Sequence, residues 1–599
     1  MRRDVVRVIA AGLWIAVSSA GCFSTAETSA TAMAIERDVG VPMRDGVILR
    51  ADLYRPPGPG PFPVLVYRTP YDRRAAAERY RTHLEAVERG YAVLLQDVRG
   101  RYGSEGVFDP YRNEGRDGYD TIEWAAVQPW SSGVVGTYGL SYPGAVQWLA
   151  AVERPPHLVA MAPAMTFSSP RQFFYFGGVF DRSWVPWIVL NIAPDLRRRA
   201  ALAGPRTAAE AERFWNQHGA AIQSRLPLAE MPELAGVAPF YFEWLRHPPE
   251  DPWWEPLEIR GRYERVEAAV LNLSGWHDEA YGPEGATTNF VGLVTARRDE
   301  PASRTRLVVG PWVHGVASIA ERRVGELDFG AAAALDYDDL VLDWMDRWLR
   351  GRVEEPAPAP VELFVMGANE WRDYDSWPPE GAEPMPLHLA PGGALSGEPP
   401  ASAEASSVFL SDPADPVVDP FGGFGPHDLS SLGGRHDVLV FETAPLSEPV
   451  EIVGPIEAEI FLSCDCRDTD LWVTLLDVGA DGRAFNLMSP GSNVLRASYR
   501  EPSRGRRLLE PGRVYRLRLP NMATAHRFAA GHTIRLLVST TFAPYLSVNL
   551  HTGELETATA RSRPAEVRIH HDPGRPSRLV VPRISRAGAS GVAAARDES

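Results

Sequence analysis

The sequence predicts an α/β fold followed by a separate all-β domain. Buried strand segments alternate with helical segments in the first half of the chain, which is typical of a mostly parallel sheet. After a Pro/Ala-rich segment at 354–360, the pattern changes to period-two alternation with frequent turns, as in a β-sandwich. A chain of 599 residues is also too long for one hydrophobic core, so we expect several domains.

The α/β part reads as an antiparallel pair of strands followed by buried strands and helices. The pair is predicted at 39–43 and 47–54. Short aliphatic runs that end in turns predict buried strands at 64–67, 91–95, 134–135, 158–162, 270–273 and 306–309. Helical spacing predicts helices at 74–89, 117–127 and 335–349.

Two further regions complete the predicted domain organisation. An aromatic-rich stretch at 166–259 predicts a helical insertion, with helices at 173–178, 184–192 and 208–215. The α/β domain then comprises 34–165 and 260–352. Strands of the β-sandwich, which we place at 353–587, are predicted at 361–366, 455–462, 471–476, 514–519 and 533–538. Residues 588–599 have the composition of a disordered tail.

Composition excludes several classes of function. The net charge of −16 argues against a nucleic-acid partner and leaves no basic face for an anionic membrane. The sequence contains no lysine, so all 61 basic residues are arginines. This excludes a Walker-type phosphate loop, a Schiff-base enzyme and a Ser–Lys dyad, because each requires an amine. A serine nucleophile in this chain needs histidine as its base.

The N-terminal segment has the features of an export signal. Arg2 and Arg3 precede an apolar run at 8–17, which is too short for a membrane span and ends in small residues before Cys22. We therefore predict a signal peptide at 1–22, a disordered tether at 23–33 and export from a bacterium. Ala-Gly-Cys resembles a lipobox, which makes Cys22 a candidate lipidation site and membrane anchor. Ser19 departs from the usual leucine, so simple cleavage after Ala20, giving a secreted or periplasmic protein, stays open.

The other two cysteines, Cys464 and Cys466, are expected to pack inside the β domain. They alternate along a predicted strand and so face one side of it. Three cysteines in the whole chain supply neither a disulfide framework nor a Cys-rich zinc site.

A glycine-rich turn from strand to helix carries the first candidate catalytic residue. Ser141 lies in the segment 136–144, GTYGLSYPG, between a predicted strand and an apolar helical run. A serine between glycines at such a turn is typical of a nucleophile elbow, which exposes the serine Oγ. The following amide, that of Tyr142, would lie at a helix N-terminus, where free N–H groups favour an oxyanion. The second glycine comes one residue later than in G-x-S-x-G, so a helix-capping serine stays open as the alternative.

Two later strand ends supply an acid and a base in the order expected after a catalytic serine. One predicted strand runs into Ser-Gly-Trp-His-Asp, which ends at Asp278, and the next runs into Gly-Pro-Trp-Val-His, which ends at His314. Sites of α/β sheets lie at such strand ends. We therefore expect Ser141 as nucleophile, His314 as base and Asp278 as the acid that orients the base. His277, the rival base, adjoins Asp278 and is expected to point elsewhere as a structural residue.

Asp278, His314 and two further histidines each fit an alternative role. Asp278 alone could cap the following segment, and His314 alone could be a satisfied buried histidine. The run His570-His571-Asp572 resembles a metal ligand set, but it lies near the chain end and we expect no metal there.

Ordered motifs along the chain resemble a known family. They lie at 43–47 (MRDGV), 68–72 (RTPYD), 97–100 (DVRG), 117–120 (DGYD), 128–130 (QPW), 139–142 (GLSY), 275–278 (GWHD) and 310–314 (GPWVH). In this set the chain resembles the cocaine-esterase-like (CocE/NonD) hydrolases, which group with X-Pro dipeptidyl-peptidases and α-amino-acid ester hydrolases. The resemblance covers nearly the whole mature chain, and the family's elbow, G-x-S-Y-x-G, has the same late glycine.

The resemblance implies an α/β-hydrolase domain, a helical cap over 166–259 and a C-terminal jelly-roll (galactose-binding-like) domain. It implies Ser141, His314 and Asp278 as a catalytic triad and no cofactor. It also implies an oxyanion hole made by the phenol of Tyr71 and the backbone amide of Tyr142. Without the resemblance, Tyr71 reads as a turn aromatic that follows a proline.

The expected activity is two-step acyl transfer on a small-molecule ester or amide. Amino-ester hydrolases of the group carry extra carboxylates shortly after the triad aspartate, where this chain has Ala280 and Tyr281, although Glu279 precedes them. We therefore disfavour α-amino-ester and X-Pro dipeptidyl-peptidase activity, which remain the alternatives. Aromatic residues at 173–176, 184 and 187 are either an acyl pocket or cap core. A non-catalytic surface binding protein is the alternative from another class.

Overall fold

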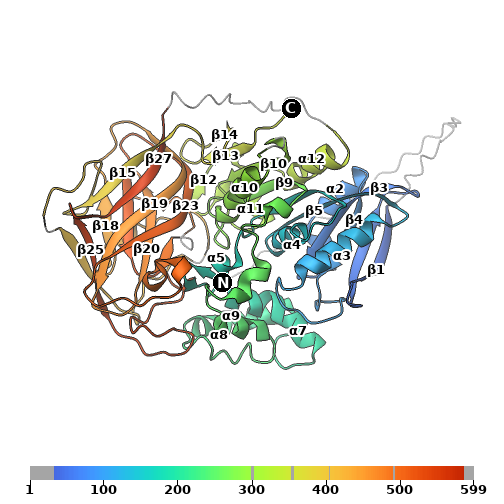
Figure 1. Cartoon of the computed structure of the whole chain (residues 1–599), viewed down its shortest axis with the longest axis horizontal. Coiled ribbons are helices and arrows are strands. Elements are labelled where there is room, and N and C mark those ends of the chain that lie inside the picture. The colour runs from blue at the N-terminus through green and yellow to red at the C-terminus, as the bar shows by residue number, and fades with distance from the viewer. Residues whose placement is uncertain are drawn as a thin grey trace, which may run out of the picture.

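The computed structural model describes residues 33–585, except for 299–301, 353–356, 404, 422 and 490–492. The predicted signal peptide with Cys22, all but the last residue of the tether and the predicted tail lie outside the described residues. Over the part that is described, no helix is both long enough and apolar enough to cross a membrane. Figure 1 shows two parts side by side, a sheet flanked by helices and a domain built of strands.

The first part is organised around a sheet that has ten strands within the described residues, in the order β1-β2-β4-β3-β5-β6-β9-β10-β13-β14. The strands from β4 to β13 in this order pair in parallel, whereas β1, β2 and β14 pair in antiparallel fashion at the two edges. The bounds are β1 (Ala34–Pro42), β2 (Ile48–Arg55), β3 (Phe62–Thr69), β4 (Ala92–Asp97), β5 (Ser131–Leu140), β6 (Leu158–Ala164), β9 (Ala269–Gly275), β10 (Thr305–Gly310), β13 (Val361–Val365) and β14 (Glu370–Tyr374).

Helices cover both faces of this sheet, which explains why its central strands read as continuous aliphatic runs. Helices α3 (Glu114–Ala126) and α4 (Tyr142–Ala151) pack on one face, where Ile122 and Trp148 are buried. Helices α2 (Thr82–Glu88) and α12 (Tyr337–Leu349) pack on the other. The remaining helices of this part are α1 (Arg73–Arg79), α10 (Glu284–Ala296) and α11 (Val316–Ile319). The predicted α/β class is therefore confirmed.

The sheet extends further along the chain than predicted. The strand predicted at 361–366 as the start of the β-sandwich is β13, which instead pairs in parallel with β10. The hairpin strand β14 then closes this edge of the sheet. The sequence pattern did not distinguish the two positions because every residue of β13 is buried, as in a sandwich strand.

The insertion at 166–259 forms a cap of short helices, with α7, α8 and α9 grouped along the lower edge of the molecule in Figure 1. Its elements are α5 (Pro170–Phe174), β7 (Tyr175–Phe176), β8 (Val179–Phe180), α6 (Trp184–Trp187), the π-helical turn η1 (Ile188–Ile192), α7 (Ala193–Arg199), α8 (Ala208–Gln223), α9 (Pro239–Arg246) and the 3-10 helix η2 (Pro252–Leu257). The helix predicted at 173–178 is wrong beyond Phe174, where a hairpin forms. Gly177 takes φ 52°, and a Cβ there would lie 2.1 Å from the Val494 carbonyl oxygen.

The C-terminal domain is all-β, as predicted. Its longest paired strands are β19 (Val450–Cys464) and β23 (Tyr515–Phe528), which are antiparallel. The other strands are β15 (Ala382–Ala390), β16 (Ala394–Ser396), β17 (Ser406–Ser411), β18 (Leu439–Glu442), β20 (Asp470–Val478), β21 (Ala484–Asn486), β22 (Val494–Arg496), β24 (Thr533–Ser539), β25 (Ala565–Asp572), β26 (Arg575–Pro576) and β27 (Arg578–Ile584).

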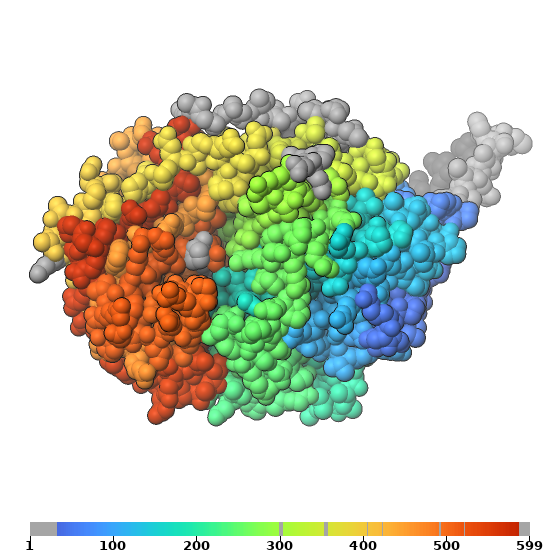
Figure 2. Space-filling model, in the orientation of Figure 1, coloured from blue at the N-terminus to red at the C-terminus, as the bar shows by residue number. Residues whose placement is uncertain are grey.

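The β domain docks directly onto the cap. The backbone N–H of Arg182 donates to the Tyr545 carbonyl at 2.7 Å, and the N–H of Leu228 donates to the Glu556 carbonyl at 2.9 Å. In Figure 2 the orange and red β domain lies against the green and teal central region. The cap is therefore fixed to the β domain by backbone hydrogen bonds, and the β domain also packs directly on the edge of the α/β sheet.

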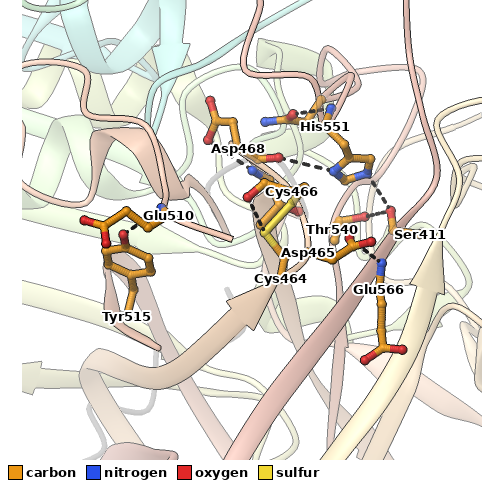
Figure 3. Close-up of a disulfide and its surroundings, with 12 residues drawn as sticks. Ser411, Cys464, Asp465, Cys466, Asp468, Glu510, Tyr515, Thr540, His551 and Glu566 are labelled. Atoms are coloured by element: carbon orange, nitrogen blue, oxygen red, sulfur yellow. Dashed lines mark hydrogen bonds between the residues drawn. A yellow bond between two sulfur atoms is a disulfide. The ribbon is translucent and has the colours of Figure 1, made fainter. Parts of the chain in front are cut away.

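The structure corrects the expectation for two cysteines. Cys464 and Cys466 are buried, but they are joined by a disulfide, with their Cα atoms 5.2 Å apart (Figure 3). Their alternation predicts that the two cysteines lie on one strand, but they do not. In fact β19 ends at Cys464 and the chain bends beyond it, which brings the second thiol back toward the first.

Candidate active site

Ser141 lies at a tight elbow between β5 and α4. Its backbone takes φ 70° and ψ −127°, a conformation that residues with side chains rarely adopt. Two glycines make the turn feasible. A Cβ at Gly139 would lie 2.5 Å from Pro143 Cβ, and a Cβ at Gly144 would lie 2.6 Å from the Ala164 carbonyl oxygen. The late glycine of the motif is thus required by the approach of β6 to the start of α4.

The Tyr142 side chain anchors the start of this helix. Its hydroxyl donates to Glu114 Oε1 at 2.8 Å and accepts the Tyr111 backbone N–H at 3.0 Å. Its ring stacks on that of Tyr111 with centroids 4.4 Å apart. The Tyr142 N–H is the first amide of α4, where no preceding turn of helix offers it a carbonyl. This fixed amide is available to an oxyanion.

Asp278 and His314 form the pair predicted from their strand ends. The loop after β9 carries Asp278, which is fully buried, and the loop after β10 carries His314. His314 Nδ1 lies 2.9 Å from Asp278 Oδ1. The same oxygen accepts the backbone N–H groups of Ala280 and Tyr281, which fixes the carboxylate. The capping role considered for Asp278 is therefore present together with the histidine contact.

Nearby carboxylates raise the pKa of His314. Burial alone would lower this pKa, but the charge and hydrogen bond of Asp278 and the charge of Glu279 outweigh burial. Glu279 Oε2 also accepts the His314 backbone N–H at 3.2 Å. Burial raises the pKa of Glu279 to about 7, against the opposing charge of His314. His314 therefore contacts two carboxyl groups, one at its ring and one at its backbone.

Tyr71 lies at the predicted place, in the turn after β3. Its hydroxyl accepts the indole N–H of Trp187 at 2.9 Å. Burial raises the pKa of Tyr71 to about 12, while hydrogen bonds with Trp187 and Ser141 lower it by less. The phenol is therefore neutral at physiological pH and has a proton to donate.

Tyr281 adds a second phenol beside the nucleophile. Its ring stacks on Phe173 with centroids 4.1 Å apart and lies 5.4 Å from the His314 ring. Burial raises the pKa of Tyr281 far above its ordinary value, while interactions with Tyr111 and Ser141 oppose this rise. Tyr281 is therefore uncharged at physiological pH and supplies no carboxylate beside Ser141.

Ser141, His314 and Tyr71 line one cavity of about 590 Å³. Among the aromatic residues proposed for an acyl pocket, Trp187 lines this cavity. The others are buried, as the alternative held: Phe173, Phe174, Tyr175 and Trp184 pack within the cap, and Phe176 packs against the β domain.

The remaining histidine candidates lie elsewhere. His277 is buried, its ring nitrogens have no hydrogen-bond partner among the described residues, and burial lowers its pKa to about 3. His570 and His571 interact with the hydroxyls of Ser463 and Ser407. Within the described ranges no group of three or more His, Cys, Asp or Glu side chains is arranged to hold a metal ion.

Sequence reasoning did not assign roles to three groups that shape this site. The sequence indicates only that Glu279 follows the aspartate and that Trp187 is one of several aromatics, and it indicates nothing for Glu114. The position of Glu279 next to Asp278 does indicate that its side chain lies near the site. The contacts of Trp187 and Glu114 cross between distant segments, so no local pattern could reveal them.

Two family models match the chain, one over each of its two main parts. The model for the X-Pro dipeptidyl-peptidase (S15 family) matches residues 45–316. The model for the X-Pro dipeptidyl-peptidase C-terminal non-catalytic domain matches residues 356–580.

Among individual proteins, a cocaine esterase from Rhodococcus sp. (strain MB1 Bresler) is 35% identical over 587 residues, covering 92% of this chain and 99% of that protein. An α-amino acid ester hydrolase structure superposes with a TM-score of 0.79 at 24% identity, covering 94% and 98% of the two chains. An aminopeptidase structure from a marine sediment archaeon, Thaumarchaeota archaeon, gives 0.79 at 23% identity, covering 95% and 99%. At these identities the two structures establish the fold.

Proposed function

The chain belongs to the cocaine esterase-like serine hydrolases of the X-Pro dipeptidyl-peptidase (S15) family, and we propose that it hydrolyses esters through Ser141, His314 and Asp278. The predicted family resemblance is thereby confirmed, and the non-catalytic alternative is set aside, because the relatives are serine hydrolases. The assignment of roles is carried by the hydrogen bond from His314 to a buried carboxylate at the edge of the cavity that contains Ser141.

In the proposed reaction, His314 Nε2 accepts the Ser141 proton as Oγ attacks the ester carbonyl carbon. Asp278 stabilises the imidazolium that forms. The tetrahedral oxyanion accepts hydrogen bonds from the Tyr71 hydroxyl and the Tyr142 N–H. His314 then gives its proton to the departing alkoxide, and water attacks the acyl-enzyme by the same steps.

The acyl group that we propose is neutral next to the carbonyl. A substrate ammonium would need a free carboxylate, yet Ala280 and Tyr281 supply none. Asp278 is fully buried and its Oδ1 accepts three N–H groups, and Glu279 accepts the His314 amide. The pKa of Glu279 near 7 further reduces its charge at neutral pH. The ammonium group of an α-amino ester or an X-Pro peptide would therefore bind without a charged hydrogen-bond partner.

A substrate panel tests this proposal. We expect methyl phenylacetate to be turned over with kcat/KM at least about tenfold higher than phenylglycine methyl ester, which has the same leaving group but carries an α-ammonium. Gly-Pro-p-nitroanilide should be hydrolysed least. Preference for the ammonium-bearing ester or the X-Pro substrate would overturn the proposed substrate class while leaving the serine chemistry intact.

We also propose that the enzyme is exported and anchored by lipid at Cys22, on the sequence pattern alone. Expression with labelled palmitate in a lipoprotein-processing bacterium tests this. The wild-type chain should take up label and partition into detergent, and Cys22→Ser should abolish both. An unlabelled, soluble chain that begins at Gly21 would instead support simple cleavage after Ala20.

A further inference from the structure

Trp187, in the cap, donates a hydrogen bond to Tyr71, the proposed side-chain donor of the oxyanion hole, and its ring stacks on the side chain of Tyr142. Its indole N–H donates to the Tyr71 hydroxyl oxygen at 2.9 Å. Its ring lies nearly parallel to the Tyr142 ring, with an interplanar angle of 11° and centroids 6.4 Å apart. Trp187 also lines the cavity that contains Ser141. One cap side chain therefore contacts the side chains of both Tyr71 and Tyr142, the two residues that supply the proposed oxyanion donors.

The direction of the Trp187–Tyr71 hydrogen bond determines what Tyr71 can do. An indole N–H can only donate, so the Tyr71 oxygen must be the acceptor. Tyr71 keeps its own proton for another acceptor, and its hydroxyl also interacts with the Ser141 side chain. Accepting one hydrogen bond polarises the phenol and strengthens the bond that it donates.

A buried arginine holds the two partners in place. Arg101 donates to the Pro70 carbonyl at 2.8 Å, directly before Tyr71. It also donates to the carbonyls of Asn191 and Ile192, at 3.1 and 2.8 Å, in the π-helical turn that follows Trp187. Arg101 is fully buried. The turn that carries Tyr71 and the cap segment that follows Trp187 are thus joined by one rigid guanidinium, in addition to the hydrogen bond between Trp187 and Tyr71.

We propose that Trp187 is a positioning residue of the oxyanion hole, whose N–H fixes the Tyr71 hydroxyl so that its proton points at the substrate carbonyl oxygen. The inference rests on the proposed function, because it assumes that Tyr71 donates to the oxyanion. It makes the cap a part of the catalytic machinery in addition to a wall of the substrate cavity.

Trp187→Phe removes the N–H and keeps a ring. We expect kcat for p-nitrophenyl butyrate to fall about threefold to tenfold, as for one lost hydrogen bond, with KM changed less than twofold. Phenylboronic acid forms a tetrahedral adduct with Ser141 Oγ, the serine proton passing to His314, and one boron hydroxyl mimics the oxyanion. Its inhibition constant should rise by the same factor as kcat falls.

Trp184→Phe is the matched control. Trp184 packs edge-on against Trp187 with centroids 5.2 Å apart, and its indole nitrogen has no hydrogen-bond partner among the described residues. We expect less than a twofold change in kcat. Equal losses in both variants, or a loss in Trp187→Phe that appears in KM alone, would mean that Trp187 acts by packing and would overturn the proposal.

A double-variant cycle separates this inference from the proposed function. Once Tyr71→Phe has removed the phenol, adding Trp187→Phe should lower kcat by less than twofold more. A full further loss would show that Trp187 does not act through Tyr71. If Tyr71→Phe alone kept the wild-type rate, the oxyanion role of Tyr71 itself would fail. If only that variant were impaired and Trp187→Phe were not, the positioning role alone would fail.

Discussion

The Glu279 carboxylate accepts the backbone N–H of His314 at 3.2 Å, while the neighbouring Asp278 binds the ring of the same histidine at 2.9 Å. Two consecutive residues thus each place a carboxyl group in contact with His314. Asp278 contacts the imidazole directly, whereas Glu279 acts on it only through charge. The two residues should consequently have separable effects, one on the rate and one on its dependence on pH.

Glu279→Gln should move the acidic limb of the kcat/KM profile to lower pH. His314 must be neutral to accept the Ser141 proton, so activity rises with pH as the imidazole loses its proton. The Glu279 charge raises the pKa of His314, and removing that charge lowers this pKa. The pH profile of p-nitrophenyl butyrate hydrolysis measures the shift. Glu321→Gln, at an exposed site, should leave the profile in place, and a shift to higher pH in Glu279→Gln would contradict the assignment.

Asp278→Asn should lower kcat about 10⁴-fold with little change in stability, because the amide no longer favours the productive tautomer of His314. Steady-state kinetics at the pH optimum and the thermal unfolding midpoint measure the two effects. A loss of less than about tenfold would indicate that His314 does not depend on Asp278 for its orientation.

Gly144→Ala should destabilise the chain by about 1–3 kcal/mol, because the added methyl group would clash with the Ala164 carbonyl oxygen at 2.6 Å. The intrinsic gain of about 1 kcal/mol from alanine in a helix is expected to be smaller than this cost. Urea denaturation measures the difference. Gly434→Ala, where a Cβ meets nothing within 4 Å, is the control and should be nearly neutral.

Arg496→Met should destabilise the β domain by about 3–5 kcal/mol. Arg496 is only 3% exposed and pairs with Asp470 and Glu556, each at 2.9 Å, so its loss leaves two buried carboxylates without their cation. Chemical denaturation followed by tryptophan fluorescence checks this. Arg504→Met breaks a pair with Glu501 that is 62% and 46% exposed, and should cost less than about 1 kcal/mol. A loss of stability in Arg496→Met no larger than that in Arg504→Met would show that the buried ion pairs of Arg496 contribute no more than an exposed pair.

Local sequence patterns were sufficient for the catalytic sheet and for the order of the proposed triad. Aliphatic runs mark strands that are buried on both faces, and Asp278 and His314 follow such runs directly. The patterns failed where long-range contacts decide the structure. Strand β13 joins the catalytic sheet because of its parallel pairing with β10, which the period of its residues does not encode.

The hairpin after Phe174 and the Cys464–Cys466 disulfide have the same explanation. Gly177 turns the chain because the Val494 backbone approaches it from the β domain, and the disulfide forms because β19 ends one residue before the bend. Trp187 is linked to the proposed oxyanion hole by its hydrogen bond to Tyr71, which lies 116 residues away in the sequence. Spacing within one segment carries no information about such contacts.

Labelling with a fluorophosphonate probe tests the assignment of Ser141 as a nucleophile that His314 activates. We expect rapid labelling of the folded wild-type chain, none of Ser141→Ala, and labelling slowed by orders of magnitude in His314→Ala, while both variants keep the wild-type unfolding midpoint. Undiminished labelling of folded Ser141→Ala, or no labelling of the folded wild type, would contradict this assignment.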